Sequence, residues 1–404
     1  MTPVRRIAVL KFGGTSMADA EVRALAAERV AQARDDGYAV VAVVSAMGRA
    51  PAPYATDSLL ALVGGDDGSP NADLAAACGE MLAAAVFAQE LRAAGIEARA
   101  LTGAQAGIRT DGRHGNAAIR RIDPSSVVAV LDRGAVAVVA GYQGAADDGT
   151  ITTLGRGGSD LTAIALGSAL GAERIDIYTD VQGVMTADPR RISAAETIAR
   201  VTFEEMSELA HLGARVMHHR AAHLAHERGV PYAIRDVRSG VGTIVDDTTV
   251  SGRPVTGVTL TAPMSWVHVE RESGAAYDDA TVGVLGRIAA SGISIDQVAL
   301  NGKGIAFAVH GRHAAEVAAI LREASMPHER RDGCAKLSVI GAGMRGRPGV
   351  VHAVISALAG ARIPIVHATD SHITISVLVP EEYAARAEQV VHDHFGLGRR
   401  AETG

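Results

Sequence analysis

Cysteine and aromatic residues are scarce in this chain of 404 residues, which has two cysteines, one tryptophan and 3% aromatic residues. Cys78 and Cys334 lie far apart, so they indicate reduced thiols in the cytoplasm rather than a disulfide framework. The few aromatic rings argue against a platform on which nucleic-acid bases stack. A formal net charge of -6 also gives no basic footprint for nucleic acid. We therefore expect no nucleic-acid partner.

Long hydrophobic runs are absent as well. No stretch of 18 apolar residues occurs, and the first residues, MTPVRRIAVLKFGG, have no apolar core of a signal peptide. We therefore expect no membrane partner and a cytoplasmic location. What is present is an ordinary globular balance of 48% hydrophobic and 21% charged residues, and the length indicates two or three domains.

Apolar strand patterns alternate with helical spacing from Ile7 to Val237. This alternation predicts an α/β fold with an open, mostly parallel sheet between helices. Thr202 and Glu205 have the spacing of a capping box, which predicts that a helix begins there. The segment Arg49–Asp73 is rich in Gly, Pro and Asp, so it is interpreted as a long loop or lid.

The stretch from Ile151 to Leu170, ITTLGRGGSDLTAIALGSAL, predicts a strand that breaks at glycines and opens into a helix. Such a turn presents backbone N–H groups and the positive end of the helix dipole to an anion. Arg156 adds a planar fork suited to a carboxylate or phosphate, and Asp160 could hold an ammonium group. The alternative is a local ion pair between these two side chains that caps the helix.

Several polar residues and glycines follow predicted strands of this sheet. Ligands of open α/β sheets bind beyond the carboxyl ends of the strands. We therefore expect one edge of the sheet to bring together Lys11, Ser45, Gly141, Arg156 and Asp180.

After residue 240 the pattern β-α-β-β-α occurs twice, which predicts two ferredoxin-like units. In the first unit, Val255–Leu260 and Trp266–Glu270 are predicted to be separate strands.

Other residues have plain structural interpretations. Glu80, taken alone, is typical of a solvated helix residue, and the loop from Thr179 to Arg190 fits an ordinary connection as well as a binding loop. Four histidines resemble metal ligands by their spacing, but no third ligand stands nearby, so no metal site is predicted; they are His218, His219, His223 and His226.

Several separated motifs together resemble the aspartate kinases, and most closely their diaminopimelate-sensitive aspartokinase I type from bacilli. These motifs include KFGGTSMADAE, VVSAMGR, ITTLGRGGSDLTAIALG, IYTDVQGVMTADPR and IGAGMRGRPGVVHAVISAL. The resemblance implies an amino-acid kinase domain at 1–245, an ACT domain at 246–332 and a second ACT domain at 333–404. It also implies transfer of a phosphoryl group from ATP, with Mg²⁺, to the side-chain carboxylate of L-aspartate.

The resemblance assigns roles to individual residues. The substrate ammonium would be bound by Glu80 and Asp160, and its α-carboxylate by Arg156, in the turn Gly157-Gly158-Ser159. Catalysis would depend on Lys11, Arg156 and Asp160. The nucleotide would be held by Lys11, Phe12, Gly13, Gly14, Ser45, Thr179, Asp180, Met185, Asp188, Arg190 and Arg215.

The resemblance further implies feedback control by diaminopimelate, lysine or threonine, and a homodimer or higher homo-oligomer that forms through the ACT domains. The candidate effector contacts are Ser294, Ile295, Asp296, Pro364 and Ile365. Two positions depart from the family pattern GAKVxHPR: Arg215 replaces a lysine and His219 replaces a proline. Because of these departures, a second interpretation is that the protein is a weakly catalytic regulatory homologue. A third is an amino-acid kinase that acts on glutamate or N-acetylglutamate.

Overall fold

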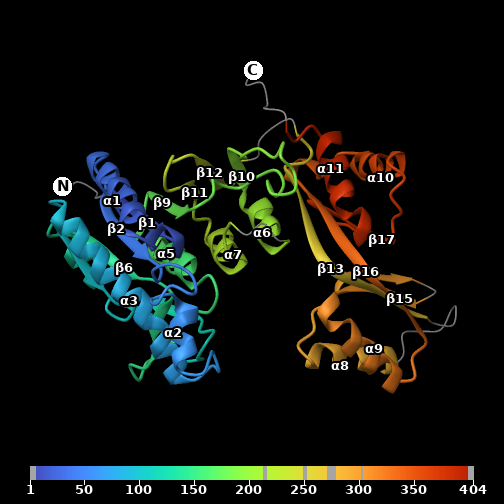
Figure 1. Cartoon of the computed structure of the whole chain (residues 1–404), viewed down its shortest axis with the longest axis horizontal. Helices are drawn as coiled ribbons and strands as arrows, with labels where there is room; N and C mark the ends of the chain where they lie inside the picture. The colour runs from blue at the N-terminus through green and yellow to red at the C-terminus, as the bar shows by residue number, and fades with distance from the viewer. Residues whose placement is uncertain (1–5, 213–215, 249–252, 271–278, 302–303, 399–404) are drawn as a thin grey trace. The chain divides into compact units, whose positions relative to one another are not determined.

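The computed structural model describes residues 6–212, 216–248, 253–270, 279–301 and 304–398, and it divides into two units (Figure 1). Unit 1 extends to Val184 and also includes Thr197–His211 and the described residues between 216 and 248. Unit 2 comprises Met185–Glu196, Leu212 and the described residues after 252. The expected domain boundary near residue 245 lies close to the end of unit 1, but Met185–Glu196 groups with unit 2.

Unit 1 is built on an eight-stranded sheet in which all neighbouring strands are parallel except β11 and β12. The central strands are runs of Val, Ile, Leu and Ala that are buried on both faces, as is typical of a parallel sheet covered by helices. The predicted sheet is thus confirmed. The strands, in spatial order, are β10 (Arg200–Thr202), β12 (Gly242–Asp246), β11 (Tyr232–Asp236), β9 (Arg174–Thr179), β1 (Ile7–Phe12), β2 (Ala39–Val44), β6 (Val136–Ala140) and β3 (Ala98–Leu101).

The helices of unit 1 include one that begins at the predicted capping box. The Thr202 hydroxyl accepts a hydrogen bond from Glu205 N at 3.1 Å, and the Glu205 carboxylate accepts one from Thr202 N at 2.9 Å. This reciprocal pair confirms that prediction. The described helices of unit 1 are η1 (Gly14–Met17), α1 (Ala20–Asp35), α2 (Thr56–Leu62), α3 (Pro70–Ala93), α4 (Ser125–Leu131), α5 (Gly158–Leu170), α6 (Phe203–His211) and α7 (His219–Arg228).

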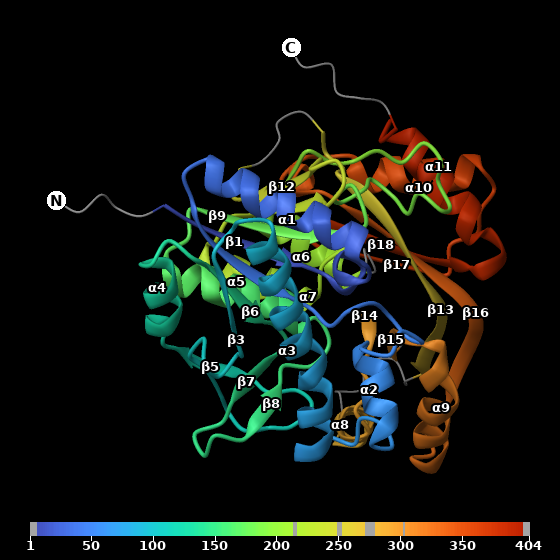
Figure 2. The ribbon, with the colours of Figure 1, turned by 60° about the vertical axis from the view of Figure 1, so that its left-hand side comes forward.

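The prediction of a loop over Arg49–Asp73 is wrong, because this segment contains α2 and the first turn of α3. Ser69 is the N-cap residue of α3, its hydroxyl accepts a hydrogen bond from Ala72 N at 3.2 Å, and Pro70 follows at the first helical position. By length and composition α3 could cross a membrane, but it packs on β3, β6 and β8 beside α2, as a core helix does (Figure 2).

The sequence predicted the strand at Ile151 but not the separate four-stranded sheet of unit 1 to which it belongs, because strands of three or four residues leave little pattern. Its order is β5 (Ile119–Ile122), β4 (Ile108–Thr110), β7 (Gln143–Ala145) and β8 (Ile151–Thr153). The buried carboxylate of Asp73 fastens α3 to it, since it accepts hydrogen bonds from Gly115 N at 3.0 Å and from the Thr153 hydroxyl, and faces His114 Nδ1 at 2.7 Å. The glycine turn at 155–158 therefore follows a strand of this small sheet, not of the main one.

Unit 2 contains a six-stranded sheet in the order β14 (Asp296–Asn301), β15 (Gly304–His310), β13 (Gly257–Glu270), β16 (His328–Ile340), β18 (Thr374–Pro380) and β17 (His367–Asp370). It follows the predicted β-α-β-β-α order twice and confirms two ferredoxin-like modules. The expected strands Val255–Leu260 and Trp266–Glu270 form one strand, β13, with irregular register around Met264. The start of β13 pairs with the end of β16 and so completes the sheet of the second module.

The helices of unit 2 bury two apolar clusters against this sheet. One cluster includes Val267, Phe307 and Leu321 in the first module, and the other includes Leu337, Val354 and Val391 in the second. The helices are α8 (Asp279–Ala290), η2 (Gly311–His313), α9 (Ala314–Glu323), η3 (Ala342–Met344), α10 (Val350–Gly360), η4 (Glu381–Tyr383) and α11 (Ala384–His394). The boundary expected at 332/333 falls inside β16.

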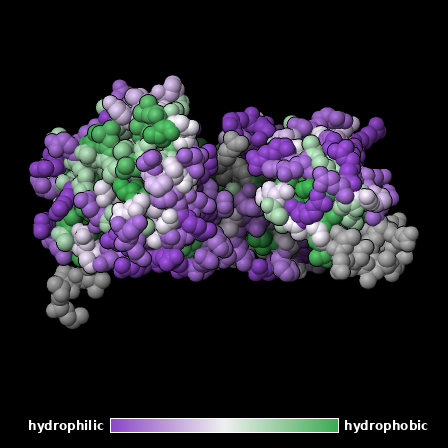
Figure 3. Space-filling model, turned by 90° about the horizontal axis from the view of Figure 1, so that it is seen from below, coloured by the Kyte–Doolittle hydropathy of each residue, from purple (hydrophilic) through white to green (hydrophobic). Residues whose placement is uncertain are grey.

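The surface of unit 1 carries some of the large apolar side chains that remain exposed. Those on α2 and α3 are Leu62, Leu74 and Leu82. Figure 3 shows a patch of hydrophobic residues on this unit, at the left of the picture.

Candidate active site

Lys11 and Asp160 form a buried ion pair at the carboxyl end of the central strand. Lys11 is the next-to-last residue of β1, and Asp160 lies in the first turn of α5. Lys11 Nζ lies 2.6 Å from Asp160 Oδ1, without the angle of a hydrogen bond, and both residues are 8% exposed. The other carboxylate oxygen of Asp160 accepts a hydrogen bond from His218 N at 3.4 Å. The pair places an ammonium and a carboxylate where a ligand of this sheet would bind.

The turn after β1 consists of glycines held against the neighbouring strand ends. Gly13 N donates to Tyr178 O at 3.3 Å, and Ser45 N donates to Phe12 O at 3.1 Å. A Cβ at Gly14 would lie 2.9 Å from Gly48 O, so only glycine fits there. The Phe12 ring is buried in the core and stacks on Tyr178, so only the backbone of Phe12 is available to a ligand.

Glu80 lies on α3 and reaches the end of β2. Its Oε1 accepts a hydrogen bond from Ala46 N at 3.2 Å, whereas Oε2 has no hydrogen-bond partner among the residues that the structure describes. The side chain is 2% exposed, and burial raises the pKa of its carboxyl to about 8. The Thr56 side chain lowers this pKa slightly but forms no hydrogen bond of normal geometry with Oε2. Glu80 is therefore a buried carboxyl whose second oxygen can accept from a cationic ligand, not the solvated residue that its position alone suggested.

The glycine turn before α5 has the geometry that the sequence predicted. Gly157 is the N-cap residue with φ of 74°, and a Cβ there would lie 2.1 Å from His218 Cβ. Ser159 packs against Gly141, whose backbone N donates to Val44 O at 3.0 Å, so α5 begins beside the end of β2. Gly158 and Ser159 are buried in the first turn of the helix.

Arg156 is exposed in this turn. Burial and the neighbouring His219 lower the pKa of His218, and the charges of Asp160 and Arg156 act on the same imidazole. The Asp160 carboxylate raises the pKa of His218 and the Arg156 guanidinium lowers it, so both charges lie near this imidazole. Arg156 does so although it follows a strand of the small sheet.

Two tyrosines at this site were missed. Tyr142 has a left-handed backbone with φ of 69°. Its ring packs against Gly158, where a Cβ would lie 2.9 Å from Tyr142 Cδ2. Burial raises its pKa to about 12, and the charge of Glu80 adds to this shift. The Tyr232 hydroxyl is buried near Asp160, and it has no hydrogen-bond partner within the described ranges. The sequence signal that could have identified Tyr142 is its position between two glycines, in the segment GYQG that follows a predicted strand.

The residues expected to hold the nucleotide divide into two groups. Thr179 and Asp180 lie at the end of β9, next to Gly13, and the Thr179 hydroxyl donates to Asp180 Oδ1 at 3.1 Å. Arg49 lies 3.7 Å from the Asp180 carboxylate in an exposed pair, which contributes little.

Met185, Asp188 and Arg190 belong instead to the segment that groups with unit 2. A hydrogen-bonded Arg190 lowers the pKa of Asp188 to about 2, and Arg191 lies 3.2 Å from the same carboxylate. The Asp188 carboxylate thus pairs with two arginines of its own loop.

Arg215 lies outside the described residues, whereas the other departure from the family pattern, His219, lies at the start of α7. His219 is the first residue of α7, and the His218 side chain accepts a hydrogen bond from Arg220 N at 3.4 Å as its N-cap. The helix therefore begins at the position where the family has proline. In the part of the chain that the structure describes, no three His, Cys, Asp or Glu side chains gather as metal ligands.

The residues expected to bind an effector lie in unit 2. Asp296 begins β14 and forms an ion pair with the buried ammonium of Lys336. Ile365 packs against the apolar cluster of the second module. A cavity of about 380 Å³ lies elsewhere in that module, between the turn at 345–349 and the β17–β18 turn at Ser371 and His372.

Comparison with protein families matches residues 6–236 to the amino acid kinase family and residues 329–393 to an ACT domain. The chain is 42% identical to aspartokinase 1 of Bacillus subtilis, over 98% of this chain and 100% of the relative. It is 36% identical to an aspartokinase of Thermus thermophilus, over 97% of this chain and 99% of the relative.

Solved structures give the same result. The crystal structure of aspartokinase III of Escherichia coli in complex with aspartate and ADP, described as the R-state, matches with a TM-score of 0.76 and 25% identity. The same enzyme in complex with lysine and aspartate, the T-state, matches with a TM-score of 0.75 and 26% identity. Both alignments cover 96% of this chain and 99% of the other.

Proposed function

The chain belongs to the aspartokinases of the amino acid kinase family, and on this premise we propose that it transfers the γ-phosphoryl group of ATP to the side-chain carboxylate of L-aspartate. The product is 4-phospho-L-aspartate, and the reaction opens the biosynthesis of lysine, threonine, methionine and diaminopimelate. The observation that carries the proposal is the buried Glu80 carboxyl, which has one unpartnered oxygen and binds Ala46 N just after β2, the strand next to β1 with Lys11. Asp160 pairs with Lys11 from the first turn of α5.

Aspartate is recognised by its two charged α-substituents. Glu80 and Asp160 provide carboxylates for the ammonium group, and Arg156 provides a guanidinium for the α-carboxylate. An acetylated substrate has no ammonium and would leave the Glu80 oxygen unpaired, so N-acetylglutamate is disfavoured. The relative crystallised with aspartate and ADP supports this assignment.

The nucleotide phosphates are assigned to the turn after β1, with Ser45 next to it. The backbone N–H group of Gly14 and the ammonium of Lys11 suit an anion, whereas the Gly13 N–H already donates to Tyr178 O. A Cβ at Gly13 would lie 3.3 Å from Lys11 Nζ. Thr179 and Asp180 at the end of β9 are assigned to the rest of the nucleotide. Arg215 remains part of the proposal from the sequence.

Mg²⁺ fits this site as a companion of ATP. No protein cluster of three possible ligands occurs in the described ranges, and Mg²⁺ commonly enters kinase sites on substrate phosphates. When bound, Mg²⁺ supplies positive charge that offsets the charge of the transferring phosphoryl group.

The main obstacle to the reaction is electrostatic. The acceptor carboxylate is ionised at neutral pH, so no general base is needed, but it must approach an anionic phosphoryl group. Two like charges 4 Å apart repel by about 4 kcal/mol at an effective dielectric constant of 20. The Lys11 ammonium and the amides of the glycine turn offset this repulsion, and most strongly in the transition state.

Release of ADP, coupled to a spectrophotometric reporter, tests this function. We expect activity that requires aspartate, with at most weak activity on glutamate. Lys11→Ala should lower kcat far more than it raises KM for aspartate. Arg6→Ala, which removes an exposed pair with Glu173 at the other end of β1, is the matched control and should stay near wild type. Unchanged turnover in Lys11→Ala would contradict the assignment.

Regulation, assembly and location form the remaining part of the proposal. The structure of a relative in complex with lysine and aspartate supports an amino-acid effector. The homodimer or higher homo-oligomer through the ACT modules remains what the family resemblance implies. The effector contacts remain Ser294, Ile295, Asp296, Pro364 and Ile365. The effector would be diaminopimelate, lysine or threonine, and the location cytoplasmic. Titration of each amino acid in the same assay tests the effector.

A further inference from the structure

The outer face of α3 carries no charge over most of its length. The exposed positions between residues 71 and 89 recur every three or four residues, and they are Asn71, Leu74, Cys78, Leu82, Ala85 and Gln89. The acidic residues of the same stretch, Asp73 and Glu80, are buried. A surface helix of a globular protein typically has charged and polar residues on the face opposite the core. The outer face of α3 is therefore unusual for a surface that contacts water alone.

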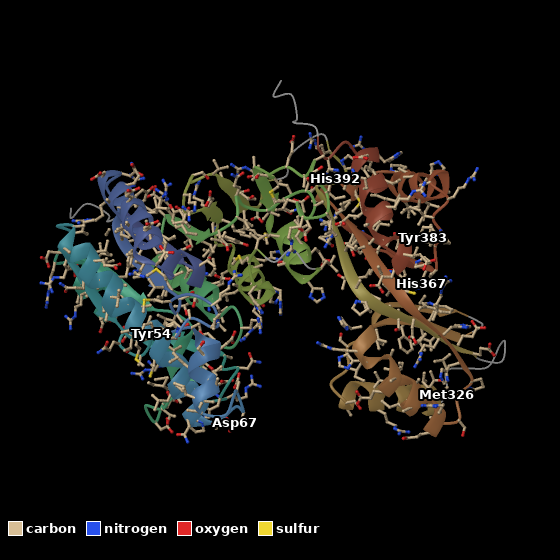
Figure 4. The ribbon with its side chains drawn as sticks, in the orientation of Figure 1. Tyr54, Asp67, Met326, His367, Tyr383 and His392 are labelled. Atoms are coloured by element: carbon tan, nitrogen blue, oxygen red, sulfur yellow. The ribbon has the colours of Figure 1, made fainter. Side chains whose placement is uncertain are left out.

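The helix α2 adds to this apolar surface. It packs beside α3, since a Cβ at Gly79 would lie 3.0 Å from Tyr54 O and 3.1 Å from a methyl carbon of Leu59 (Figure 4). Leu62, the last residue of α2, is 81% exposed, and Val63 and Tyr54 are exposed as well. Exposed apolar patches commonly mark a site of interaction. The exposed residues of α3, together with Leu62 and Val63, are called the α3 face below.

The two ends of α3 differ in charge. The loop before its N-terminal end carries Asp66 and Asp67, which are exposed (Figure 4). At the C-terminal end Arg92 and Arg99 are exposed, and Glu97 is the only acid between them. Arg92 lies 3.9 Å from the Glu97 carboxylate, in an exposed pair that contributes little. Two antiparallel copies of the helix would bring the acidic end of each copy to the basic end of the other.

A two-fold axis at Cys78 matches both patterns. Cys78 lies midway between Leu74 and Leu82, so Leu74 of each copy would lie against Leu82 of the other. The same axis directs Arg92 toward the acidic loop of the second copy. Such an interface is isologous, because one surface serves both partners.

The area of this contact is that of a reversible dimer. With 24 residues in α3 and 7 in α2, the two helices are about 36 Å and about 10 Å long. A strip about 10 Å wide along both helices would bury roughly 900 Å² over two copies. That value is close to the lower limit of about 1,000 Å² for a specific interface.

We propose that a second copy of this chain binds the α3 face, with the two α3 helices antiparallel about a two-fold axis at Cys78. The contact lies within unit 1 and is distinct from the contact through the ACT modules that the family resemblance implies. It does not depend on which reaction the chain catalyses.

Oxidative crosslinking of the full chain tests this register. Helix axes pack about 8–10 Å apart and Cα atoms lie about 2.3 Å from each axis, so facing Cys78 Cα atoms come within about 4–5 Å, which suits a disulfide. Diamide takes up the two electrons and two protons that the two thiols lose. We expect it to convert most of the wild type to a covalent dimer on a non-reducing gel. Cys78→Ser should form no such dimer, because the other cysteine, Cys334, is buried.

Sedimentation velocity tests the assembly itself. Leu82→Glu places like charges at the centre of the contact, so it should reduce the crosslink about tenfold and halve the mass of the assembly. The matched control is Val241→Glu, which should change neither. Val241 is an exposed apolar residue directly before β12, several strands away from β3 and β6, on which α3 packs. Arg92→Glu should weaken the association, and the added change Asp67→Lys should restore it.

A wild type that forms no crosslink at Cys78 would overturn the proposal, as would an equal crosslink in Leu82→Glu. Two further outcomes would assign the face to another occupant and also overturn it. One is a monomer whose Cys78 resists a thiol reagent, which indicates cover by the same chain, and the other is a monomer that binds phosphatidylcholine vesicles unless Leu82 is replaced. The crosslink in the wild type needs no substitution, so the test holds even if Leu82→Glu does not fold.

Discussion

Glu80 provides the sharpest test of the aspartate site, because its protonation should change when the substrate binds. Burial raises its pKa from 4.5 to about 8, so at pH 7 about nine in ten molecules without substrate carry the protonated acid. The substrate ammonium binds the ionised form. Ionising Glu80 costs about 1.4 kcal/mol for each pH unit below its pKa. The affinity for aspartate should therefore rise about tenfold from pH 6 to pH 7 and about fivefold from pH 7 to pH 8.

Isothermal titration calorimetry with aspartate in the presence of ADP measures this effect directly. Two buffers with different heats of ionisation report the number of protons released. At pH 7 wild type should release about 0.9 proton per aspartate bound, and at pH 9 about 0.1. Glu80→Gln cannot ionise, so it should release none of these protons, bind aspartate more weakly and lose most of the pH dependence.

A second glutamate of the same helix provides the control. Glu90 of α3 is paired with Arg23 at 2.8 Å, so Glu90→Gln should keep the proton release. His218 would add a proton term only at lower pH, since burial and His219 lower its pKa from 6.5. The reasoning is refuted if wild type binds aspartate with equal heat in both buffers at pH 7, or if Glu80→Gln still releases a proton.

Three further outcomes are expected. Arg156→Lys should raise KM for aspartate about tenfold in steady-state kinetics, since an ammonium cannot bind a carboxylate in bidentate geometry; an unchanged KM would remove Arg156 from the substrate site. Asp73→Asn should lower the free energy of unfolding by about 2–3 kcal/mol in urea titrations, because a buried acceptor of several hydrogen bonds is altered; equal stability would count against the role of Asp73. Thr202→Ala should cost about 1 kcal/mol through loss of the capping box, and a loss below 0.3 kcal/mol in the same titrations would disagree.

Much of the site could be predicted because its signals are local. A strand that stops at glycines before a helix is visible in the sequence around Lys11 and around Arg156, and parallel strands bring their carboxyl ends to one edge. Lys11, Ser45, Gly141 and Asp180 follow neighbouring strands of the main sheet as expected. Arg156 was expected with them but follows β8 of the small sheet.

What escaped prediction depends on distant partners. Glu80 is one acid on a helix, so its spacing gave no sign of burial; only the family resemblance assigned it to the substrate, and its burial and its contact with Ala46 support that proposal. Arg191 forms an ion pair with Glu388 of α11, and the two are 197 residues apart in the sequence, so no spacing rule connects them. Family resemblance assigned the loop after Asp180 to the nucleotide as a whole, whereas the structure gives its later residues a place in another core.

The antiparallel pairing of β13 with β16 along both modules has a consequence for the engineering of such regulatory regions. Each of these strands serves both modules, and the first module interrupts the sheet of the second. A fragment cut at residue 332 would expose an unpaired edge along β16, which invites aggregation. We therefore expect a fragment that contains both modules to be stable and a fragment cut at residue 332 to aggregate.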